Sequence, residues 1–279
     1  MHKIVDAGEM TSWAEAEKAK GHVVGFVPTM GFLHRGHASL MALLRPKVDK
    51  LVVSIYVNPL QFGPNEDLDT YPRDPEGDWA VCETEGVDCV FMPEDLYPDG
   101  FQTSVSVHGL ADGLCGATRP GHFEGVTTVV ARLFGVTRCD VAVFGEKDYQ
   151  QLAILRRMTR DLALPVDIIG GPLVRDSDGL ALSSRNKYLG APDRERALSL
   201  HRALFSMARA YEAGTEDTER LLEIGRQALS VDGLDYLQIV DAMTLQPVSR
   251  VSRPSRAMVA AFVGRTRLID NLHVGPPWT

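Results

Sequence analysis

The sequence predicts an α/β fold in which helices cover both faces of a parallel β-sheet, followed by a smaller α+β domain. Short, β-branched apolar runs alternate with helix-like segments as far as residue 173, and such alternation is typical of a parallel sheet. Beyond that point, two long helical stretches precede three strands of alternating apolar and polar residues, which indicate an antiparallel sheet. We therefore expect one domain at residues 1–173 and a second at 174–279.

The composition excludes several classes of protein. The 279-residue chain has a formal net charge of -8, whereas a nucleic-acid surface needs a basic face. No apolar run approaches the roughly 20 residues of a membrane helix. The N-terminus lacks the apolar core of a signal peptide, so we expect a cytoplasmic protein without a membrane or nucleic-acid partner. Four cysteines without a CxxC pair indicate reduced thiols rather than a zinc site.

The first predicted strand, residues 23–27, leads into a motif with two histidines. Apolar residues then recur at helical spacing until Pro46, so the motif at 28–37 lies where a strand passes into a helix. Free N–H groups and the positive end of the helix dipole make such a junction an anion site. His34 and His37 can both face that site from the first helical turn, although a capping or solvated histidine is the ordinary alternative.

A second apolar strand, residues 51–57, ends at Asn58 and is followed by a long polar loop over 60–73. Ligands of open α/β sheets lie beyond the carboxyl ends of the strands, which is where this loop begins. Asn58 suits an ordinary turn, whereas Gln61 has neither a turn role nor a clear place on a helix face. A ligand-binding role is the simpler reason for a glutamine there.

A glycine-rich connection at residues 113–125 follows a predicted helix at 75–85 and a third strand at 87–92. Connections of this length in a compact domain are often lids or binding loops. A helix at 126–137 and a strand at 140–144 come next. We therefore expect the connection itself to be irregular and to lie near a ligand.

The next cluster, residues 145–151, follows a buried strand and opens a helix. Its arrangement of strand, glycine and lysine repeats the anion-site pattern of the first motif. Asp148 is explained by capping the helix. Lys147 is not, because a cation there opposes the helix dipole unless an anion is bound. The cluster therefore predicts an anion site at the start of this helix.

A third cluster follows a strand at 166–169 and lies on the loop at 173–186. Ser183, Ser184 and Arg185 can clamp a polyphosphate, although on their own such residues more often form a solvated turn. The rest of the chain is predicted to form helices at 192–213 and 215–230 and strands at 234–240, 257–263 and 266–272.

Four segments of the chain match one family pattern, in that family's order and over essentially the full length. They read Pro-Thr-Met-Gly-Phe-Leu-His-Arg-Gly-His at 28–37, Val-Asn-Pro-Leu-Gln-Phe-Gly at 57–63, Phe-Gly-Glu-Lys-Asp-Tyr-Gln-Gln at 144–151 and Asp-Gly-Leu-Ala-Leu-Ser-Ser-Arg-Asn at 178–186. Together they resemble the pantothenate synthetase (pantoate–β-alanine ligase) family. The His-x-Gly-His motif alone would indicate only the wider nucleotidyltransferase superfamily.

The resemblance implies a reaction and a separate role for each domain. Residues 1–173 would form a Rossmann-like domain that binds ATP and pantoate, and residues 174–279 a lid over the ATP. Pantoate's carboxylate would attack the α-phosphorus of ATP, giving pantoyl adenylate and pyrophosphate. The amine of β-alanine would then attack the acyl carbon, releasing pantothenate and AMP in pantothenate and coenzyme A biosynthesis. Positioning and charge stabilisation suffice for this route, so no enzyme nucleophile is needed.

The resemblance also implies a role for each matching residue. The catalytic group would be His37, a proton donor, with His34, Lys147 and Arg185 on the phosphates. Gln61 and Gln151 would bind pantoate, and Gln61 would also border β-alanine. Three secondary candidates would lie near the second substrate or the gate: Asn58, Tyr71 and Arg119. The ATP site would comprise Met30, Gly31, Phe32, Leu33, His34, Arg35, Gly36, His37, Gly145, Glu146, Lys147, Asp148, Val174, Leu182, Ser183, Ser184 and Arg185.

Magnesium is implied with the ATP, whose charge it neutralises, but the sequence names no ligand for it. The resemblance implies a homodimer. It implies no tightly bound organic cofactor. Two positions depart from the family pattern. Arg35 stands where acidic or polar residues are frequent, and Leu182 replaces a common methionine at similar volume.

Two other interpretations remain open at this point. A related adenylyl- or cytidylyltransferase would share the two histidines but would leave Gln61 and Gln151 without an obvious role. A nucleotide-binding regulatory module would bind ATP and release no pyrophosphate. An enzyme like an aminoacyl-tRNA synthetase is disfavoured, because the acidic composition offers no tRNA-sized basic surface.

Overall fold

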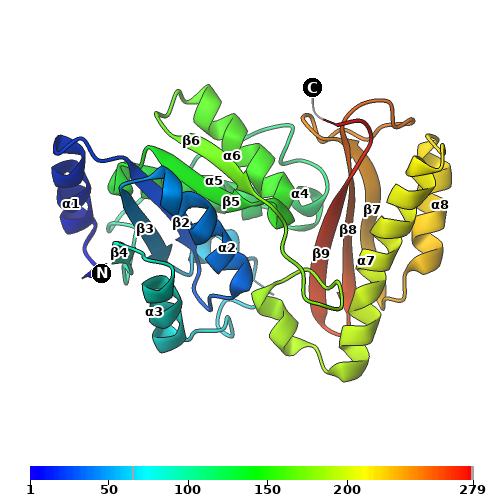
Figure 1. The fold of residues 1–279 in the computed structure, drawn as a ribbon, viewed down its shortest axis with the longest axis horizontal. Coiled ribbons are helices and arrows are strands. Elements are labelled where there is room, and N and C mark those ends of the chain that lie inside the picture. Colours follow the sequence, from blue (N-terminus) through cyan, green and yellow to red (C-terminus); the bar gives the residue numbers. More distant parts are fainter. Residues whose placement is uncertain (65, 278–279) are drawn as a thin grey trace. The chain divides into compact units, whose positions relative to one another are not determined.

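The computed structural model describes residues 1–64 and 66–277. Within these residues the chain forms a six-stranded sheet and a three-stranded sheet, each with helices packed beside it (Figure 1). The strands of the larger sheet are β1 (His2–Ile4), β2 (Val24–Thr29), β3 (Lys50–Ile55), β4 (Cys89–Phe91), β5 (Val141–Gly145) and β6 (Asp167–Gly171), and the helices along this part of the chain are α1 (Ala7–Ala19), α2 (Arg35–Leu44), α3 (Pro75–Thr84), α4 (Cys115–Thr118), α5 (His122–Thr137) and α6 (Tyr149–Asp161).

The larger sheet is parallel throughout, and its strand order is β1-β4-β3-β2-β5-β6. From β2 the chain runs outward through β3 and β4, and then places β5 and β6 on the other side of β2. The strand order therefore reverses between β2 and β5. Ligands of open α/β sheets bind beyond the carboxyl ends of the strands at such a point. The predicted α/β fold is confirmed.

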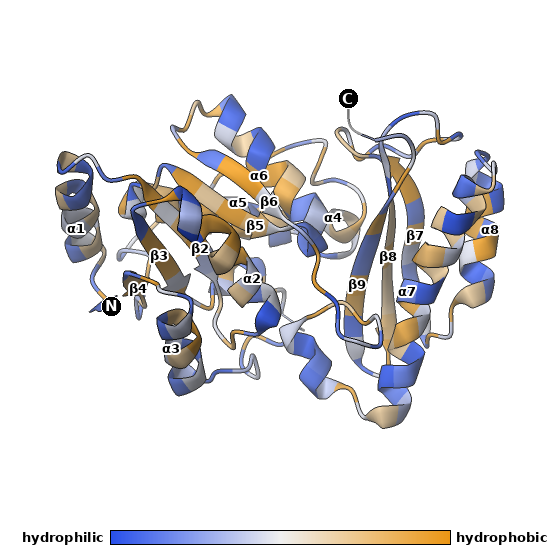
Figure 2. Cartoon of the chain, viewed as in Figure 1, coloured by the Kyte–Doolittle hydropathy of each residue, from blue (hydrophilic) through white to orange (hydrophobic). Residues whose placement is uncertain are grey.

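Successive residues of a strand point to opposite sides of the sheet. Both sides of this sheet are apolar, so helices cover both faces. Phe26 of β2 packs into a core with residues of α1, α5 and α6, whereas its neighbour Val27 packs into a second core with residues of α2 and α3. Both side chains are fully buried, and β3 and β5 are mostly orange in Figure 2. The apolar runs that predicted the strands therefore contribute to two cores.

Strand β1 and helix α1 were not predicted from the sequence. Helix α1 buries only Met10, Ala14 and Glu17, so its apolar face is too narrow to give a clear helical pattern of hydrophobic residues. Its start is fixed instead by Asp6, whose carboxylate accepts the N–H of Glu9 at 2.8 Å. The capping residue, Asp6, was the sequence feature that could have predicted the start of this helix.

The connection predicted as irregular over 113–125 is partly helical. It contains α4, and α5 begins at His122 rather than at residue 126. The prediction was wrong here because Gly125, which looked like part of a flexible loop, lies inside α5. This glycine is needed for close packing against another segment, as described below, and not for flexibility.

The structure divides into two compact units, which we call the first and the second unit. The short segments Gly113–Thr118 and Lys147–Gln150 belong to the second unit although they precede residue 174. The first unit comprises Met1–Asp112, Arg119–Glu146 and Gln151–Pro172, and the second comprises Gly113–Thr118, Lys147–Gln150 and Leu173–Thr279.

The second unit is built on an antiparallel three-stranded sheet with β8 at its centre. Ala257 and Val259 of β8 pack into a core with the two long helices that follow residue 190. On the opposite face, the guanidinium carbon of Arg256 lies 4.2 Å from the ring centroid of Tyr149. The elements are α7 (Ala191–Glu212), α8 (Thr218–Ala228), β7 (Gly233–Asp241), β8 (Ser255–Val263) and β9 (Thr266–Val274).

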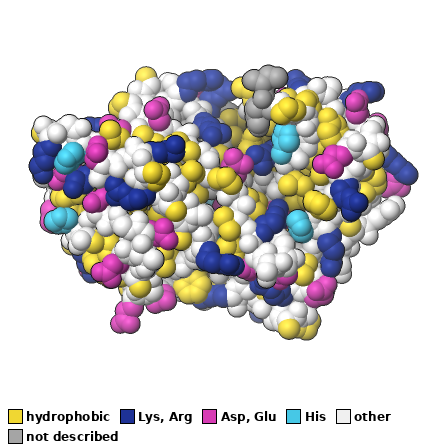
Figure 3. Space-filling view, viewed as in Figure 1, with side chains coloured by type: hydrophobic (Ala, Val, Ile, Leu, Met, Phe, Trp, Pro, Cys, Tyr) yellow, Lys and Arg dark blue, Asp and Glu magenta, His cyan; other side chains and the backbone are white. Residues whose placement is uncertain are grey.

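Several expectations from composition can be compared with the structure. The cysteines Cys82, Cys89, Cys115 and Cys139 are buried free thiols, as predicted. Every helix among residues 1–64 and 66–277 is too short or too polar to cross a bilayer. On the face drawn in Figure 3, basic and acidic side chains are interspersed, which is consistent with the balanced, slightly acidic composition.

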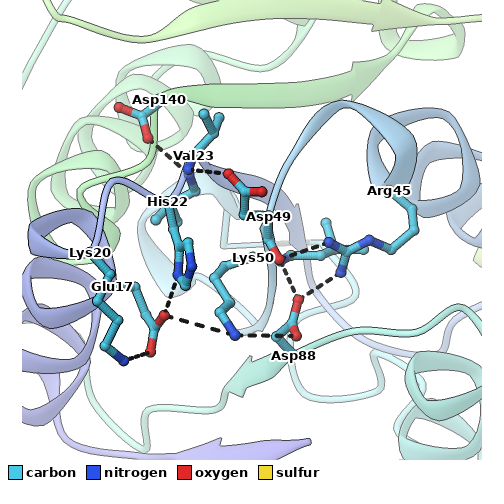
Figure 4. Close-up of polar contacts among 11 residues, drawn as sticks. Glu17, Lys20, His22, Val23, Arg45, Asp49, Lys50, Asp88 and Asp140 are labelled. Carbon is cyan, nitrogen blue, oxygen red and sulfur yellow. Dashed lines mark hydrogen bonds and ion pairs between the residues drawn. The ribbon is translucent and has the colours of Figure 1, made fainter.

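A network of charged side chains lies at the amino end of the larger sheet (Figure 4). Oε1 of the buried Glu17 is 2.8 Å from Nζ of Lys20, and Oε2 is 2.7 Å from Nδ1 of His22 and 3.8 Å from Nζ of Lys50. The hydrogen bonds from Lys20 and His22 lower the pKa of Glu17 to about 2. This carboxylate is therefore held in its charged form by the fold.

Asp88, which precedes β4, joins the same network to β3. Its Oδ2 accepts the backbone N–H of Leu51 at 2.8 Å and a guanidinium N–H of Arg45 at 2.6 Å. Nζ of Lys50 lies 4.0 Å from Oδ1 of Asp88, between this carboxylate and Glu17. The network thus ties α1, β3 and β4 together at the end of the sheet opposite the predicted site.

We expect this network to make the stability of the protein depend on pH in acid. The pKa of Glu17 is lower in the folded chain than its ordinary value of 4.5, so the folded state binds fewer protons than the unfolded state. The resulting stabilisation is complete above the unfolded value and is lost as the pH falls toward about 2. Urea unfolding of Glu17→Gln should therefore vary less with pH across this window than that of the parent. Equal pH dependence in the two proteins would contradict the prediction.

Candidate active site

The carboxyl ends of three adjacent strands carry the predicted site segments of the first unit. β2 ends just before the two-histidine motif, its neighbour β3 ends just before Asn58, and its other neighbour β5 ends at Gly145. Parallel strands present their carboxyl ends at one edge of a sheet. Segments that are far apart in the sequence therefore begin side by side, at the reversal of strand order between β2 and β5.

A tight turn joins β2 to α2. The backbone φ angles are 82° at Gly31 and 53° at Phe32, both in the left-handed region that disfavours residues with a Cβ. A Cβ at Gly31 would lie 2.8 Å from Oδ2 of Asp78, a buried residue of α3. That carboxylate accepts the N–H of Phe32 at 3.0 Å and the N–H of Leu33 at 2.6 Å. Asp78 therefore holds the turn that begins the motif.

Asp78 was not predicted as a site residue from the sequence, although it lies in the helix predicted at 75–85. Burial raises the pKa of this carboxyl, and its hydrogen bonds to the two backbone N–H groups oppose that rise. A charge at a core-facing position of a helix was the signal that could have identified it, because such groups are rarely buried without partners.

We expect Asp78→Asn to lower the free energy of unfolding by about 1–3 kcal/mol, the cost of leaving a buried donor unsatisfied. An amide has one accepting oxygen, so its NH₂ group would face one of the two backbone N–H groups. Urea unfolding measures the change. Asp74→Asn is the matched control on the same helix, because Asp74 caps α3 by accepting the N–H of Gly77 and asparagine caps equally well. Equal stability of the two variants would contradict the prediction.

The two histidines cap the start of α2 and lie against each other. Nδ1 of His34 accepts the N–H of Gly36 at 3.1 Å, and Nδ1 of His37 accepts the N–H of His34 at 3.2 Å. Their ring centroids are 4.1 Å apart. Because each Nδ1 accepts a hydrogen bond, the neutral form of each ring carries its proton on Nε2. Capping and a donor role toward an anion are thus compatible in the same residues.

Gln61 lies in the short 3₁₀ segment Pro59–Gln61, where its amide is held by neighbours. Its Oε1 accepts from Nδ2 of Asn58 at 3.0 Å, and its Nε2 lies 3.3 Å from Sδ of Met30. Asn58 is 1% exposed, and its Oδ1 accepts from the hydroxyl of Tyr97 at 2.8 Å. Asn58 therefore fixes which end of the Gln61 amide points toward the two-histidine turn.

A second set of contacts fixes the backbone of Gln61. Its carbonyl accepts from Nδ1 of His122 at 2.8 Å, and Nε2 of His122 lies 2.8 Å from a guanidinium nitrogen of Arg119. Arg119 also pairs with both carboxylate oxygens of Glu66 at 2.6 Å. Burial raises the pKa of Glu66, but the Arg119 guanidinium outweighs it, so the pKa lies below its ordinary value. Arg119 thus acts beside Gln61 as a support for that turn.

The remaining residues of the first unit lie near these segments in the chain or in space. Tyr71 is buried, and its ring lies edge-on to Phe62, the neighbour of Gln61, with centroids 5.9 Å apart. Gln151 lies in the first turn of α6 and is partly exposed. Glu146 directly follows β5. The structure therefore places the predicted pantoate residues, Gln61 and Gln151, on segments that follow β3 and β5, the two neighbours of β2.

In the second unit, Lys147 lies in the 3₁₀ segment Glu146–Asp148 between β5 and α6. Its Nζ is 3.6 Å from Oδ1 of Asp148. Its backbone carbonyl accepts from Nδ2 of Asn271 at 2.9 Å. The lysine is therefore fixed through its backbone, while its side chain is only partly buried and weakly paired within the unit.

The last cluster lies at the base of a hairpin. Arg175 and Ala181 pair across it, and the N–H of Leu182 donates to the carbonyl of Val174 at 3.0 Å. Ser183 then caps a 3₁₀ segment, Ser184–Tyr188, by accepting the N–H of Arg185 at 3.3 Å. The hairpin thus brings Val174 beside the serine–arginine cluster, as a shared ligand site requires.

Comparison with known proteins distinguishes among the interpretations of this site. The model of the Pantoate-beta-alanine ligase family matches residues 2–273. The chain belongs to that family. Proteins named pantothenate synthetase from Sulfurihydrogenibium sp. (strain YO3AOP1) and Pelobacter propionicus are 49% and 50% identical to it, covering 98% and 99% of this chain and 99% of each relative. The chain is therefore an ATP-dependent ligase, and neither alternative interpretation is needed.

Solved structures of the family have the same fold. Pantothenate synthetase from Thermus thermophilus is 47% identical, with a TM-score of 0.93 and coverage of 99% of this chain and 100% of that one. The ligase from Francisella tularensis is 34% identical, with a TM-score of 0.81 and coverage of 98% and 97%. That structure is described as complexed with β,γ-ATP and β-alanine. Members of this ligase family therefore share both units.

Proposed function

We propose that this ligase joins pantoate to β-alanine through pantoyl adenylate, consuming ATP and releasing AMP and pyrophosphate. The observation that carries the proposal is the fixed amide of Gln61. Asn58 and Tyr97 orient it at the strand-end edge where the two-histidine helix begins. A nucleotidyltransferase acting on ATP alone has no use for an oriented amide there, whereas a hydroxy acid beside the α-phosphate has hydroxyl and carboxylate groups for it to bind.

Pantoate binding is the proposed role of Gln61 and Gln151. Each amide has both a donor and an acceptor, which suits a substrate that presents hydroxyl groups and a carboxylate. Met30 borders Gln61 with its thioether, an apolar surface that suits the methyl groups of pantoate. Asn58 and Arg119 are proposed to act through Gln61, because the structure shows them holding its amide and its carbonyl.

Phosphate binding is the proposed role of the helix start and of two second-unit segments. Nε2–H groups of His34 and His37, together with the N-terminus of α2, offer donors to an anion. Lys147 and the Ser183–Arg185 cluster add cationic and hydroxyl donors. A carboxylate oxygen of pantoate bonds to the α-phosphorus. At the same time the bond between the α-phosphorus and the oxygen that bridges to the β-phosphate breaks, and pyrophosphate leaves with that oxygen and the electron pair. We propose that His37 stabilises that charge or donates a proton to it.

The second half-reaction needs an uncharged amine and a good leaving group. The amine of β-alanine attacks the acyl carbon, and the carbon–oxygen bond to AMP breaks. AMP leaves with that oxygen, and the nitrogen gives up a proton as the amide forms. Gln61 is proposed to border the β-alanine as well. The second unit is proposed to act as a lid over the nucleotide, since it carries Lys147 and Arg185.

Magnesium is proposed to arrive with ATP as part of the substrate. Among residues 1–64 and 66–277, no group of three or more histidine, cysteine, aspartate or glutamate side chains is arranged to hold a metal ion. Magnesium commonly keeps several waters and binds mainly to substrate phosphates, so such a group is not required. The homodimer implied by the resemblance and the cytoplasmic location expected from the N-terminal sequence stay predictions.

The proposal is tested by following pyrophosphate, AMP and pantothenate in separate additions. With magnesium and ATP, we expect pyrophosphate release only when pantoate is present, and AMP with pantothenate only after β-alanine is added. Release without pantoate would contradict the assigned acceptor. Formation of ADP and inorganic phosphate would contradict the adenylate route.

A further inference from the structure

Strand β9 contains two adjacent polar residues, Asp270 and Asn271, that are buried on opposite faces of the sheet of the second unit. Asp270 is opposite Val259 of β8, whose side chain faces α7 and α8, and Asn271 is opposite Met258. They are 5% and 2% exposed. Buried polar side chains are normally retained with hydrogen-bonding partners, so the partners of this pair indicate what the strand holds in place.

Asn271 holds the backbone of Lys147. Its Nδ2 donates to the carbonyl of Lys147 at 2.9 Å, while its Oδ1 accepts from a guanidinium N–H of Arg256 at 3.0 Å. The Arg256 contact fixes the orientation of the amide, because a guanidinium can only donate. Asn271 must therefore direct its NH₂ group at Lys147.

The residues that follow Lys147 are seated on the same face of the second unit. The hydroxyl of Tyr149 donates to the carbonyl of Ala242 at 2.8 Å. Oε1 of Gln150 accepts the N–H of Cys115 at 3.0 Å, and its Nε2 donates to the carbonyl of Gly113 at 2.8 Å. These bonds anchor the segment after Lys147, whereas Asn271 anchors the lysine itself.

Asp270 holds the hairpin that carries the serine–arginine cluster. Its two carboxylate oxygens accept from Arg175 at 2.7 and 2.9 Å, and Arg175 also donates to the carbonyl of Gly179 at 3.1 Å. One strand thus contacts both segments of the second unit that are proposed to bind phosphate. The strand is therefore a common support for the two segments.

We propose that Asn271 is a positioning residue that fixes Lys147 for phosphate binding. The inference rests on the proposed role of Lys147. Without the Asn271 hydrogen bond, the carbonyl of Lys147 loses a buried partner and the 3₁₀ segment can rotate. A displacement of about 1 Å in such a group can cost up to about 10²-fold in rate. Asn271 touches no substrate in this account and acts only through Lys147.

Two variants separate positioning from simple packing. Asn271→Ala removes the amide that donates to the carbonyl of Lys147. Asn271→Asp keeps the shape of the side chain and the oxygen that accepts from Arg256, but it turns an acceptor toward the carbonyl of Lys147. We expect both to slow pantoate-dependent pyrophosphate release by about 10-fold or more and to raise the KM for ATP, with the KM for pantoate little changed. Ser199→Ala is the matched control, because Ser199 is fully buried and its hydroxyl accepts the N–H of Ser230, a residue that belongs to neither segment.

A double-mutant cycle with Lys147→Ala decides whether Asn271 acts through the lysine. We expect Asn271→Ala to change the rate by less than about twofold in the Lys147→Ala background, because the group that it positions is gone. Equal losses in both backgrounds, or a loss that Asn271→Asp restores, would overturn the inference. If Lys147→Ala itself leaves adenylation unchanged, the proposed role of Lys147 fails instead. Thermal unfolding of each variant shows that the proteins compared are folded.

Discussion

We expect replacement of His37 by glutamine to lower the rate of pantoate-dependent pyrophosphate release by about 10²–10³-fold, the loss typical of one donor removed from a developing charge. The reason lies in the two functions of the ring. Nδ1 of His37 accepts the N–H of His34 within the helix cap, so the neutral ring carries its proton on Nε2, the group that we propose donates to a phosphate oxygen. Glutamine at this position of a capping box can still accept the backbone N–H, but it places no ring N–H at the position of Nε2.

His37→Ala is the companion variant for this experiment. It removes the cap as well as the ring, so we expect a similar loss of rate together with a loss of stability of about 1 kcal/mol. Stopped-flow or coupled assays of pyrophosphate measure the rate, and urea unfolding measures the stability. Near-parental activity of His37→Gln, with activity lost only in His37→Ala, would show that the histidine acts through the cap alone.

The second large effect is expected for Gly125→Ala. Gly125 lies in α5 directly against the segment that carries Gln61, and Nδ2 of Asn58 donates to its carbonyl at 3.1 Å. An added Cβ would lie 2.3 Å from the carbonyl oxygen of Leu60 and 2.6 Å from the backbone nitrogen of Gln61. Backbone atoms cannot rotate away as a side chain can. The helix or the Gln61 segment must therefore move.

We expect Gly125→Ala to raise the KM for pantoate by about 10-fold or more and to destabilise the protein by about 1–3 kcal/mol, the usual cost of overpacking. Gly135→Ala is the matched control in the same helix, because nothing lies within 4 Å of its added Cβ. It should leave the KM unchanged and stabilise the helix by roughly 0.5–1 kcal/mol. Steady-state kinetics and urea unfolding of both variants measure these effects. Similar behaviour of the two would contradict the assigned contact.

The sequence predicts the fold well where burial dictates the pattern. The apolar runs that gave β2, β3 and β5 are buried on both faces of a parallel sheet, so their hydrophobicity is continuous and easy to recognise. The ends of these strands were predicted within about two residues. The clusters at 28–37 and 145–151 follow them directly, so finding the strands also located the segments of the candidate site.

Features that depend on tertiary contacts could not be predicted from local pattern. The start of α5 was placed too late, because Gly125 gains its packing from a segment more than sixty residues away, Leu60 to Gln61. Asp78 and Asn271 were missed because their partners, the turn at Leu33 and the carbonyl of Lys147, lie on other elements. No spacing in the sequence links such pairs.

The central claim is that pantoate is activated as an acyl adenylate. It is tested most directly with pantoate labelled with ¹⁸O in both carboxylate oxygens, in a complete reaction with ATP, magnesium and β-alanine. The account predicts that one labelled oxygen appears in AMP and the other in the amide carbonyl of pantothenate, because the bond that breaks joins the acyl carbon to the attacking oxygen. Label in inorganic phosphate, or AMP without label, would contradict an adenylate formed by attack of the carboxylate on the α-phosphorus.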